Sequence, residues 1–229
     1  MRATPSPATG TTPGHQGHFD GYDVLDQVPT WDDVTTGVVL GRLGPPEPLR
    51  FFSPAEEATA GALFDQLLDQ WQEPKVPVLA MVDQRLNADR TDGWHYDDMP
   101  PDGEAWHRTL KLLDEESRDR HGAPFGQLTR GQQAAVLQAV VDCGPRPWRT
   151  LPAARVWSLW TRYACTAFYA HPFAWNEIGF GGPAYPRGYK NIGLDKREPW
   201  ERPNRSAHDP IPDIRAVEQA RRAGGEGSR

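Results

Sequence analysis

Two groups of residues in this sequence have the side-chain types for acid–base or metal chemistry. His171 and Glu177 lie within seven residues of each other, and an imidazole with a carboxylate can move a proton to or from a substrate. His95 lies close to Asp97 and Asp98, and these side chains are ordinary metal ligands. Either group would suit a stand-alone enzyme, which is one hypothesis for this chain.

Both groups also have simpler interpretations. His171 follows a predicted helix, where an imidazole favours the negative C-terminal end and bonds the last carbonyl groups. The spacing of His95, Asp97 and Asp98 matches no known metal loop, and acidic loops such as this one and the stretch from Asp20 to Asp33 are usually solvated. We therefore predict neither a metal site nor a catalytic residue.

Common signatures of catalysis and cofactor binding are absent from the sequence. It contains no GxGxxG fingerprint, P-loop, GxSxG elbow or HExxH pair. A flavin or nicotinamide dinucleotide normally needs the first of these, so we expect no cofactor on this chain. Cys143 and Cys165 fall in successive predicted helices, too far apart for a disulfide if those helices form a hairpin. We expect two free, buried thiols.

The segment from Ala174 to Tyr189, AWNEIGFGGPAYPRGY, is the most informative part of the chain, and we call it the limb. Its glycines and prolines disfavour regular structure, while its rings offer large, stiff apolar faces. Such a segment must pack against something, either its own domain or another protein. Aromatic residues and arginine dominate binding energy at protein interfaces. The limb therefore supplies these candidate partner-interface residues: Trp175, Phe180, Tyr185, Arg187 and Tyr189.

The elements that must position the limb are predicted to be helical. Just before it, the helix from about Leu151 to Ala170 is apolar nearly all round. Such a helix is either central in a bundle or covered by a partner, so Trp160 on it is a further interface candidate. The limb has the same two interpretations, which are compatible because one face can pack inward while the other binds.

Capping motifs and apolar spacing predict four earlier helices. Ser53 with Glu56, and Thr129 with Gln132, have the spacing of capping boxes that begin two of them. A shorter helix runs from about Pro77 to Leu86. The remaining one carries apolar residues at helical spacing and two i,i+4 ion pairs. Its residues are Trp106, Leu110 and Leu113, with the pairs Asp114–Arg118 and Glu116–Arg120.

Between and after these helices the chain is irregular. The segment from Asn87 to Asp102 is predicted to be a long loop, and the run from Thr36 to Leu40 could pair weakly as a strand. After Pro172 the helical pattern ends, returning only in a possible short helix from Ile211 to Arg222. The fold class we predict is mostly α, a small bundle of about five helices with a long irregular N-terminal arm and an extended Gly/Pro/aromatic limb.

Length and composition limit the organisation and the partners. The 229 residues, with 38% hydrophobic residues, 23 Pro and 22 Gly, suit one domain over residues 21–200, a flexible arm over 1–20 and a tail over 201–229. A net charge of −6 without a basic cluster argues against nucleic acid as a partner, and no apolar run is long enough to span a membrane. The first 20 residues show neither an apolar signal region nor twin arginines, which predicts a cytoplasmic protein.

The limb and the helix before it resemble the gluconate 2-dehydrogenase subunit 3 family. In that family a helix ends at an aromatic turn, followed by Trp/Asn and a Gly-aromatic-Gly/Pro loop. The corresponding residues here are Tyr169 to Pro172, Asn176, and Ile178 to Pro183. The likeness covers about residues 50–200, and it adds Tyr169 and Asn176 to the interface candidates.

The resemblance implies a small subunit without a cofactor, bound to a flavoprotein dehydrogenase of the glucose–methanol–choline type that carries FAD. In such complexes the large subunit oxidises a sugar or polyol, and the small one supports its folding, stability or export. Many members of the family begin with a twin-arginine signal and are periplasmic. The first 20 residues of this chain show no such signal, so the sequence departs from the family pattern here. A carbohydrate-binding module is a third hypothesis, since nine Trp could stack on sugars.

Overall fold

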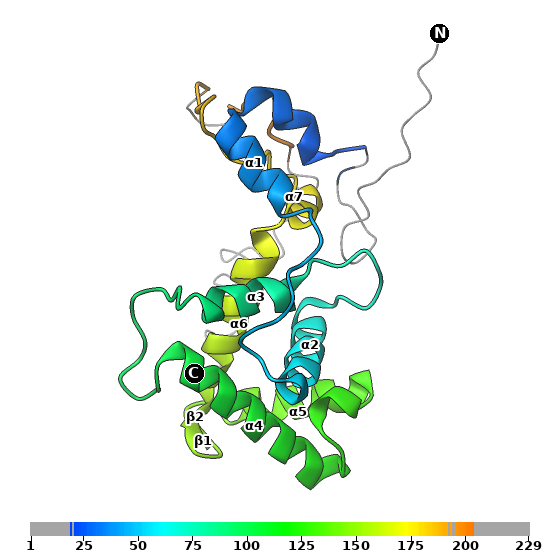
Figure 1. The fold of residues 1–229 in the computed structure, drawn as a ribbon, viewed down its shortest axis with the longest axis vertical. Coiled ribbons are helices and arrows are strands. Elements are labelled where there is room, and N and C mark those ends of the chain that lie inside the picture. The colour runs from blue at the N-terminus through cyan, green and yellow to red at the C-terminus, as the bar shows by residue number, and fades with distance from the viewer. Residues whose placement is uncertain (1–18, 20, 192, 194–195, 204–229) are drawn as a thin grey trace, which may run out of the picture.

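The structure, a computed structural model, describes residues 19, 21–191, 193 and 196–203. It is mostly α-helical, as the sequence predicts (Figure 1). Short 3-10 turns are labelled η. The elements are η1 (Val24–Thr30), α1 (Asp33–Gly41), α2 (Pro54–Leu68), α3 (Val78–Asn87), α4 (Asp102–His121), η2 (Phe125–Gln127), α5 (Arg130–Asp142), β1 (Pro147–Trp148), β2 (Leu151–Pro152), α6 (Ala153–Tyr169) and α7 (Pro172–Ile178).

Helices α2 to α6 form a bundle around the larger of two hydrophobic cores. Helix α6 is central, because it contacts α2, α3, α5 and α7. Trp160 on α6 and Trp106 on α4 are fully buried, and the indole N–H of Trp160 donates a hydrogen bond to the hydroxyl of Thr109 at 3.1 Å. A helix that is apolar nearly all round is here a core helix. The antiparallel pair β1 and β2 joins α5 to α6.

The predicted helix starts follow from local hydrogen bonding. Both capping boxes are present, Ser53 with Glu56 on α2 and Thr129 with Gln132 on α5. On α4 the two predicted i,i+4 ion pairs also form. The long loop is confirmed as well, because residues 88–101 contain no helix or strand.

A second, smaller core lies at one end of the molecule. Five buried residues form it: Tyr22, Val24, Trp31, Val39 and Trp175. They come from the start of the described chain, from α1 and from α7, which are far apart in the sequence and lie together at the top of Figure 1. We call the unit made of η1, α1, α7 and the limb the cap. The limb therefore packs on the N-terminal segment of its own chain.

Two predictions about local structure are wrong. The run from Thr36 to Leu40 is part of α1 and not a strand, because the Asp32 side chain accepts a hydrogen bond from the N–H of Thr35 and begins a helix there. The helical pattern does not end at Pro172 but resumes there as α7, with proline in the first turn.

The remaining sequence predictions concern the ends of the chain and the membrane. The possible helix from Ile211 to Arg222 lies outside the described residues, as does nearly all of the expected arm over 1–20. Within the described part, no helix is both long and apolar enough to cross a membrane.

Candidate partner interface

Long-range hydrogen bonds hold the limb against the N-terminal segment. The Trp31 indole N–H donates to the carbonyl of Pro183 at 3.0 Å. The Tyr22 hydroxyl donates to the carbonyl of Phe180, also at 3.0 Å. Because carbonyl groups in a segment without regular structure need such donors, these bonds give the limb a defined conformation.

Glycine allows the limb to approach the aromatic rings of the cap. Gly182 has a φ of +75°, and a Cβ atom there would collide with the indole ring of Trp31. A Cβ atom at Gly179, with a φ of +68°, would lie 2.6 Å from the ring of Phe19. Both positions require the left-handed conformation and the small size of glycine.

Three of the predicted interface residues are buried, which removes them from the exposed surface. Trp160 belongs to the bundle core and Trp175 to the cap core. The Asn176 side chain is 6% exposed and accepts a hydrogen bond from the N–H of Val24. These three residues position the limb from inside. The helical spacing of Trp160 agrees with its alternative interpretation as a core residue.

Four other predicted interface residues are exposed at the cap end. Tyr185 is 68% exposed, Tyr189 51%, Tyr169 50% and Phe180 39%. The ring of Phe180 rests edge-on against Trp175, with 5.5 Å between ring centroids. The buried Trp175 thus supports the ring of Phe180, whose other face is exposed to solvent.

Arg187 is held within the cap. Its guanidinium donates to the side chains of Gln27 and Thr30 and to the carbonyl of Gly181, and it lies 4.1 Å from the centroid of the Trp200 ring. Burial lowers the pKa of this group below its ordinary value. Arg187 therefore braces the limb against η1.

Sequence reasoning missed part of the exposed apolar surface. Ten large apolar side chains are exposed in the described part of the chain, and only Trp94 and Val141 lie outside the cap end. The other eight, which we call the cap surface, are Val34, Val38, Leu40, Tyr169, Ile178, Phe180, Tyr185 and Tyr189. The i,i+4 spacing of Val34 and Val38 was the signal for the part on α1, hidden because that run resembles a strand.

His171 has a structural role different from the one predicted. Its Nδ1 accepts the N–H of Phe173 as the N-cap of α7, and its Nε2 is hydrogen-bonded to the carbonyl of Arg42 at 2.9 Å. The side chain is 2% exposed, and burial lowers its pKa to about 4. A neutral imidazole bonded on both sides fixes the junction of cap and bundle. Glu177 lies six positions further along the chain, in the last turn of α7, and is partly buried.

His95, Asp97 and Asp98, the second group with side chains suited to metal or acid–base chemistry, do not come together as one site. Nδ1 of His95 is bonded to the carbonyl of Tyr96, while Asp98 forms an ion pair with Arg155 at 3.4 Å. In the described residues no group of three or more His, Cys, Asp or Glu side chains is placed to hold a metal ion. The geometry gives no support to chemistry at this loop.

The cysteines agree with their prediction only in part. Cys143 and Cys165 are both free, but Cys143 is only half-buried and Cys165 is exposed. Cys165 follows the fully buried Ala164 on α6, and the helical turn carries its side chain to the outer face.

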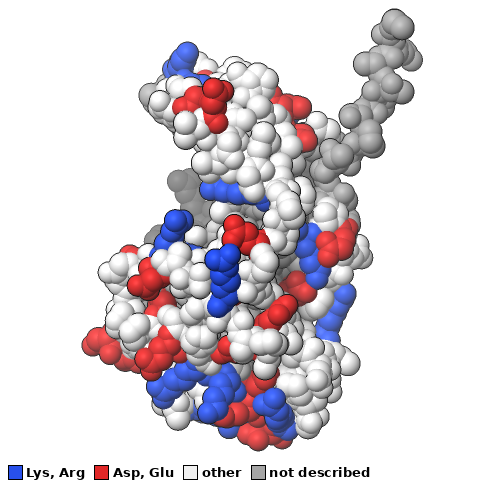
Figure 2. Space-filling view, in the orientation of Figure 1, with Lys and Arg blue, Asp and Glu red and all other residues white. Residues whose placement is uncertain are grey.

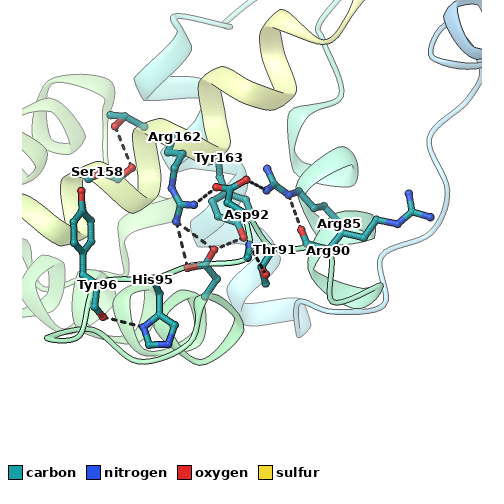
Figure 3. Close-up of polar contacts among 12 residues, drawn as sticks. Arg85, Arg90, Thr91, Asp92, His95, Tyr96, Ser158, Arg162 and Tyr163 are labelled. Atoms are coloured by element: carbon teal, nitrogen blue, oxygen red, sulfur yellow. Dashed lines mark hydrogen bonds and ion pairs between the residues drawn. The ribbon is translucent and has the colours of Figure 1, made fainter.

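A chain of alternating charges links the long loop to α3 and α6 (Figure 3). Asp92 bridges the guanidinium groups of Arg85 and Arg162. Arg162 also contacts Asp102 at 3.2 Å, and that carboxylate accepts the hydroxyl of Tyr163 at 2.6 Å. Burial acts to raise the pKa of Asp92, but the bonds from the two arginines outweigh it and hold that pKa low. Burial and the bond to Asp102 raise the pKa of Tyr163. These charges are mutually satisfied and hold the loop in place.

Comparison with known proteins identifies the bundle. The model of the family described as gluconate 2-dehydrogenase subunit 3 matches residues 54–182, from α2 into the limb. The match ends at Gly182 and leaves η1 and α1 outside it. Searches of curated proteins and of solved structures give no match. Since the matched region is more than half of the 229 residues, the chain belongs to the gluconate 2-dehydrogenase subunit 3 family.

Proposed function

We propose that this chain is a non-catalytic accessory subunit that binds and stabilises the large subunit of a flavin-dependent sugar or polyol dehydrogenase. The partner is a flavoprotein of the glucose–methanol–choline type, and it carries the FAD. Membership of a family named for a dehydrogenase subunit supports this role. The family name indicates a dehydrogenase subunit. The type of partner, its FAD and the stabilising role of this chain are our proposal.

The observation that carries the proposal is the concentration of exposed apolar side chains at one end of the molecule. Monomeric proteins rarely expose large apolar patches, and such patches often mark protein contacts. The cap surface contains Phe180, Tyr185 and Tyr189 of the limb and Tyr169 at the end of α6, and aromatic residues are enriched in binding hot spots. A stable interface needs about 800 Å² from each partner. We propose the cap surface as the docking site.

His171, the strongest candidate for catalysis, favours the non-catalytic role. Both of its ring nitrogens are occupied by backbone groups, and a general base needs a free nitrogen within reach of substrate. Alanine at His95 or Glu177 that abolished turnover by the purified chain would instead support the enzyme hypothesis.

Co-purification tests the proposal. The tagged chain is expressed with an untagged flavoprotein dehydrogenase, and recovered flavin is measured by its absorbance. Val38→Ser and Tyr185→Ser are expected to reduce recovery at least about tenfold, since losing an anchor typically costs about 2 kcal/mol. Val141→Ser is the matched control because Val141 is exposed on α5, at 41% against 55% for Val38.

Two outcomes would contradict different parts of the proposal. Equal recovery with Val38→Ser, Tyr185→Ser and Val141→Ser would exclude the cap surface as the docking site. A large subunit that is fully soluble, stable and active without this chain would exclude the accessory role. Unchanged helical circular dichroism of each variant shows that the bundle still folds.

A further inference from the structure

A cleft of about 560 Å³ lies where the cap meets the bundle. It is lined by the end of α1, by α3 and the loop that follows it, and by the last turns of α6. Figure 2 shows a recess between the cap, at the top, and the bundle below it, with basic side chains on both margins. Its volume is within the range of small-molecule sites in proteins.

The cleft is positively charged although the protein is acidic. Its lining includes Arg42, Arg85 and Arg90 but only one acid, Asp92, so its formal charge is +2 in a chain of net charge −6. Arg85 is neutralised by Asp92. Among the described residues, no acidic side chain pairs with Arg42 or Arg90. These two guanidinium groups carry the excess charge.

Arg42 is held in place without a counter-ion. Its guanidinium donates to the carbonyl of Ala170 and lies 5.7 Å from the centroid of the Trp175 ring. It is partly buried, and burial alone lowers its pKa. A partly desolvated charge without a counter-ion is unfavourable, and an anion in the cleft would compensate it.

We infer that this cleft binds a small oxyanion, the carboxylate or phosphate group of a free small molecule, between Arg42 and Arg90. The planar guanidinium is suited to paired hydrogen bonds with such groups. Hydroxyl groups of Thr91 and Thr166 line the same cleft and can bond further oxygens. Met81, Val82, Ala167 and Ala170 provide an apolar wall for the body of the ligand. This inference does not depend on the accessory role.

Calorimetric titration of the full chain tests the inference. Malonate and inorganic phosphate are the two probes, at an ionic strength fixed with chloride, and together they distinguish a carboxylate from a phosphate site. Saturable binding of at least one probe is expected. Arg42→Gln and Arg90→Gln should each weaken it about tenfold, the effect of losing a charge-assisted hydrogen bond.

Arg50→Gln is the matched control because Arg50 lies outside the lining of the cleft, and it should leave binding unchanged. Arg42→Gln removes the bond to Ala170 and can loosen the cap, whereas the Arg90 guanidinium forms no bond to the described residues, so its substitution reports on binding alone. No saturable binding of either probe would overturn the inference. Equal weakening by Arg50→Gln and Arg90→Gln would also overturn it, because the effect would then be general electrostatics.

Discussion

The side-chain carbonyl of Asn176 accepts a hydrogen bond from the backbone N–H of Val24 at 2.7 Å, although 152 positions separate the two residues. Both residues are buried. The Asn176 amide group also donates to the Asp23 carboxylate at 3.3 Å. One side chain on α7 therefore fixes the start of η1, and the cap depends on contacts between the two ends of the described chain.

Asn176→Ala should loosen this connection. The Val24 N–H would be left buried without an acceptor, which typically costs about 1–3 kcal/mol. We expect that loss in the free energy of unfolding, together with faster hydrogen exchange at the Val24 amide. Asn87→Ala, at an exposed position at the end of α3, is the control and should change neither. Unaltered exchange at Val24 would contradict the assigned role of Asn176.

Gly182→Ala should destabilise the cap more than Gly188→Ala does. Both glycines have a positive φ, +75° and +67°, and an alanine pays about 1 kcal/mol for that conformation at either position. Only at Gly182 would the added Cβ also meet the ring of Trp31, since the space around Gly188 is open. We expect a further loss of about 1–3 kcal/mol from this overlap. Urea unfolding measures the free energy of unfolding of both variants. Equal losses in Gly182→Ala and Gly188→Ala would argue against close packing of the limb on Trp31.

Asp83 supports the connection between α1 and α2 through three hydrogen bonds. Its carboxylate, 1% exposed, accepts the backbone N–H groups of Arg50, Phe51 and Phe52 at 2.8–2.9 Å. Asp83→Ala would remove all three acceptors, with an expected cost of about 3 kcal/mol. Gln84→Ala is the control, because Gln84 is the exposed neighbour of Asp83 on α3. Similar unfolding midpoints for the two variants in urea would contradict this role.

The parts of the fold that follow from neighbouring residues could be predicted from the sequence. The capping boxes at Ser53 and Thr129 and the ion pairs on α4 each depend on residues three or four positions apart. Helix α1 was missed because its β-branched run suits a strand equally well, although Asp32 was an available N-cap signal. Helix α7 was missed because Pro172 follows one helix and begins another.

The cap core could not be predicted in the same way. Trp31 and Trp175 belong to one cluster but lie far apart in the chain, and apolar periodicity reports only which face of an element is buried. The limb had to pack against something, but its composition does not distinguish an N-terminal segment of the same chain from another protein. The exposed rings of Tyr185 and Tyr189 and the buried ring of Trp175 are equally aromatic, so their different positions appear only in the structure.

His171 should make the stability of the protein depend on pH. Burial lowers its pKa to about 4 in the folded state, whereas the pKa of an unfolded histidine is about 6.5. Between these values the unfolded chain binds a proton that the folded chain does not, so the free energy of unfolding falls as the pH drops through this window. The folded form favours the neutral ring because the ring is buried and its Nδ1 accepts the N–H of Phe173, and these effects outweigh the bond to the Arg42 carbonyl, which acts to raise the pKa.

His171→Asn should remove this contribution, since asparagine can still cap α7 but does not titrate. Urea unfolding at about pH 7.5 and about pH 5 should show a smaller decrease for this variant than for the wild type. The exposed His121 provides the control as His121→Asn, which should retain the wild-type decrease. Exposed carboxylates titrate in all three proteins alike, so the comparison isolates the buried ring. An undiminished decrease in His171→Asn would mean that this imidazole accepts its proton in the folded state, and that the junction of cap and bundle tolerates a charge there.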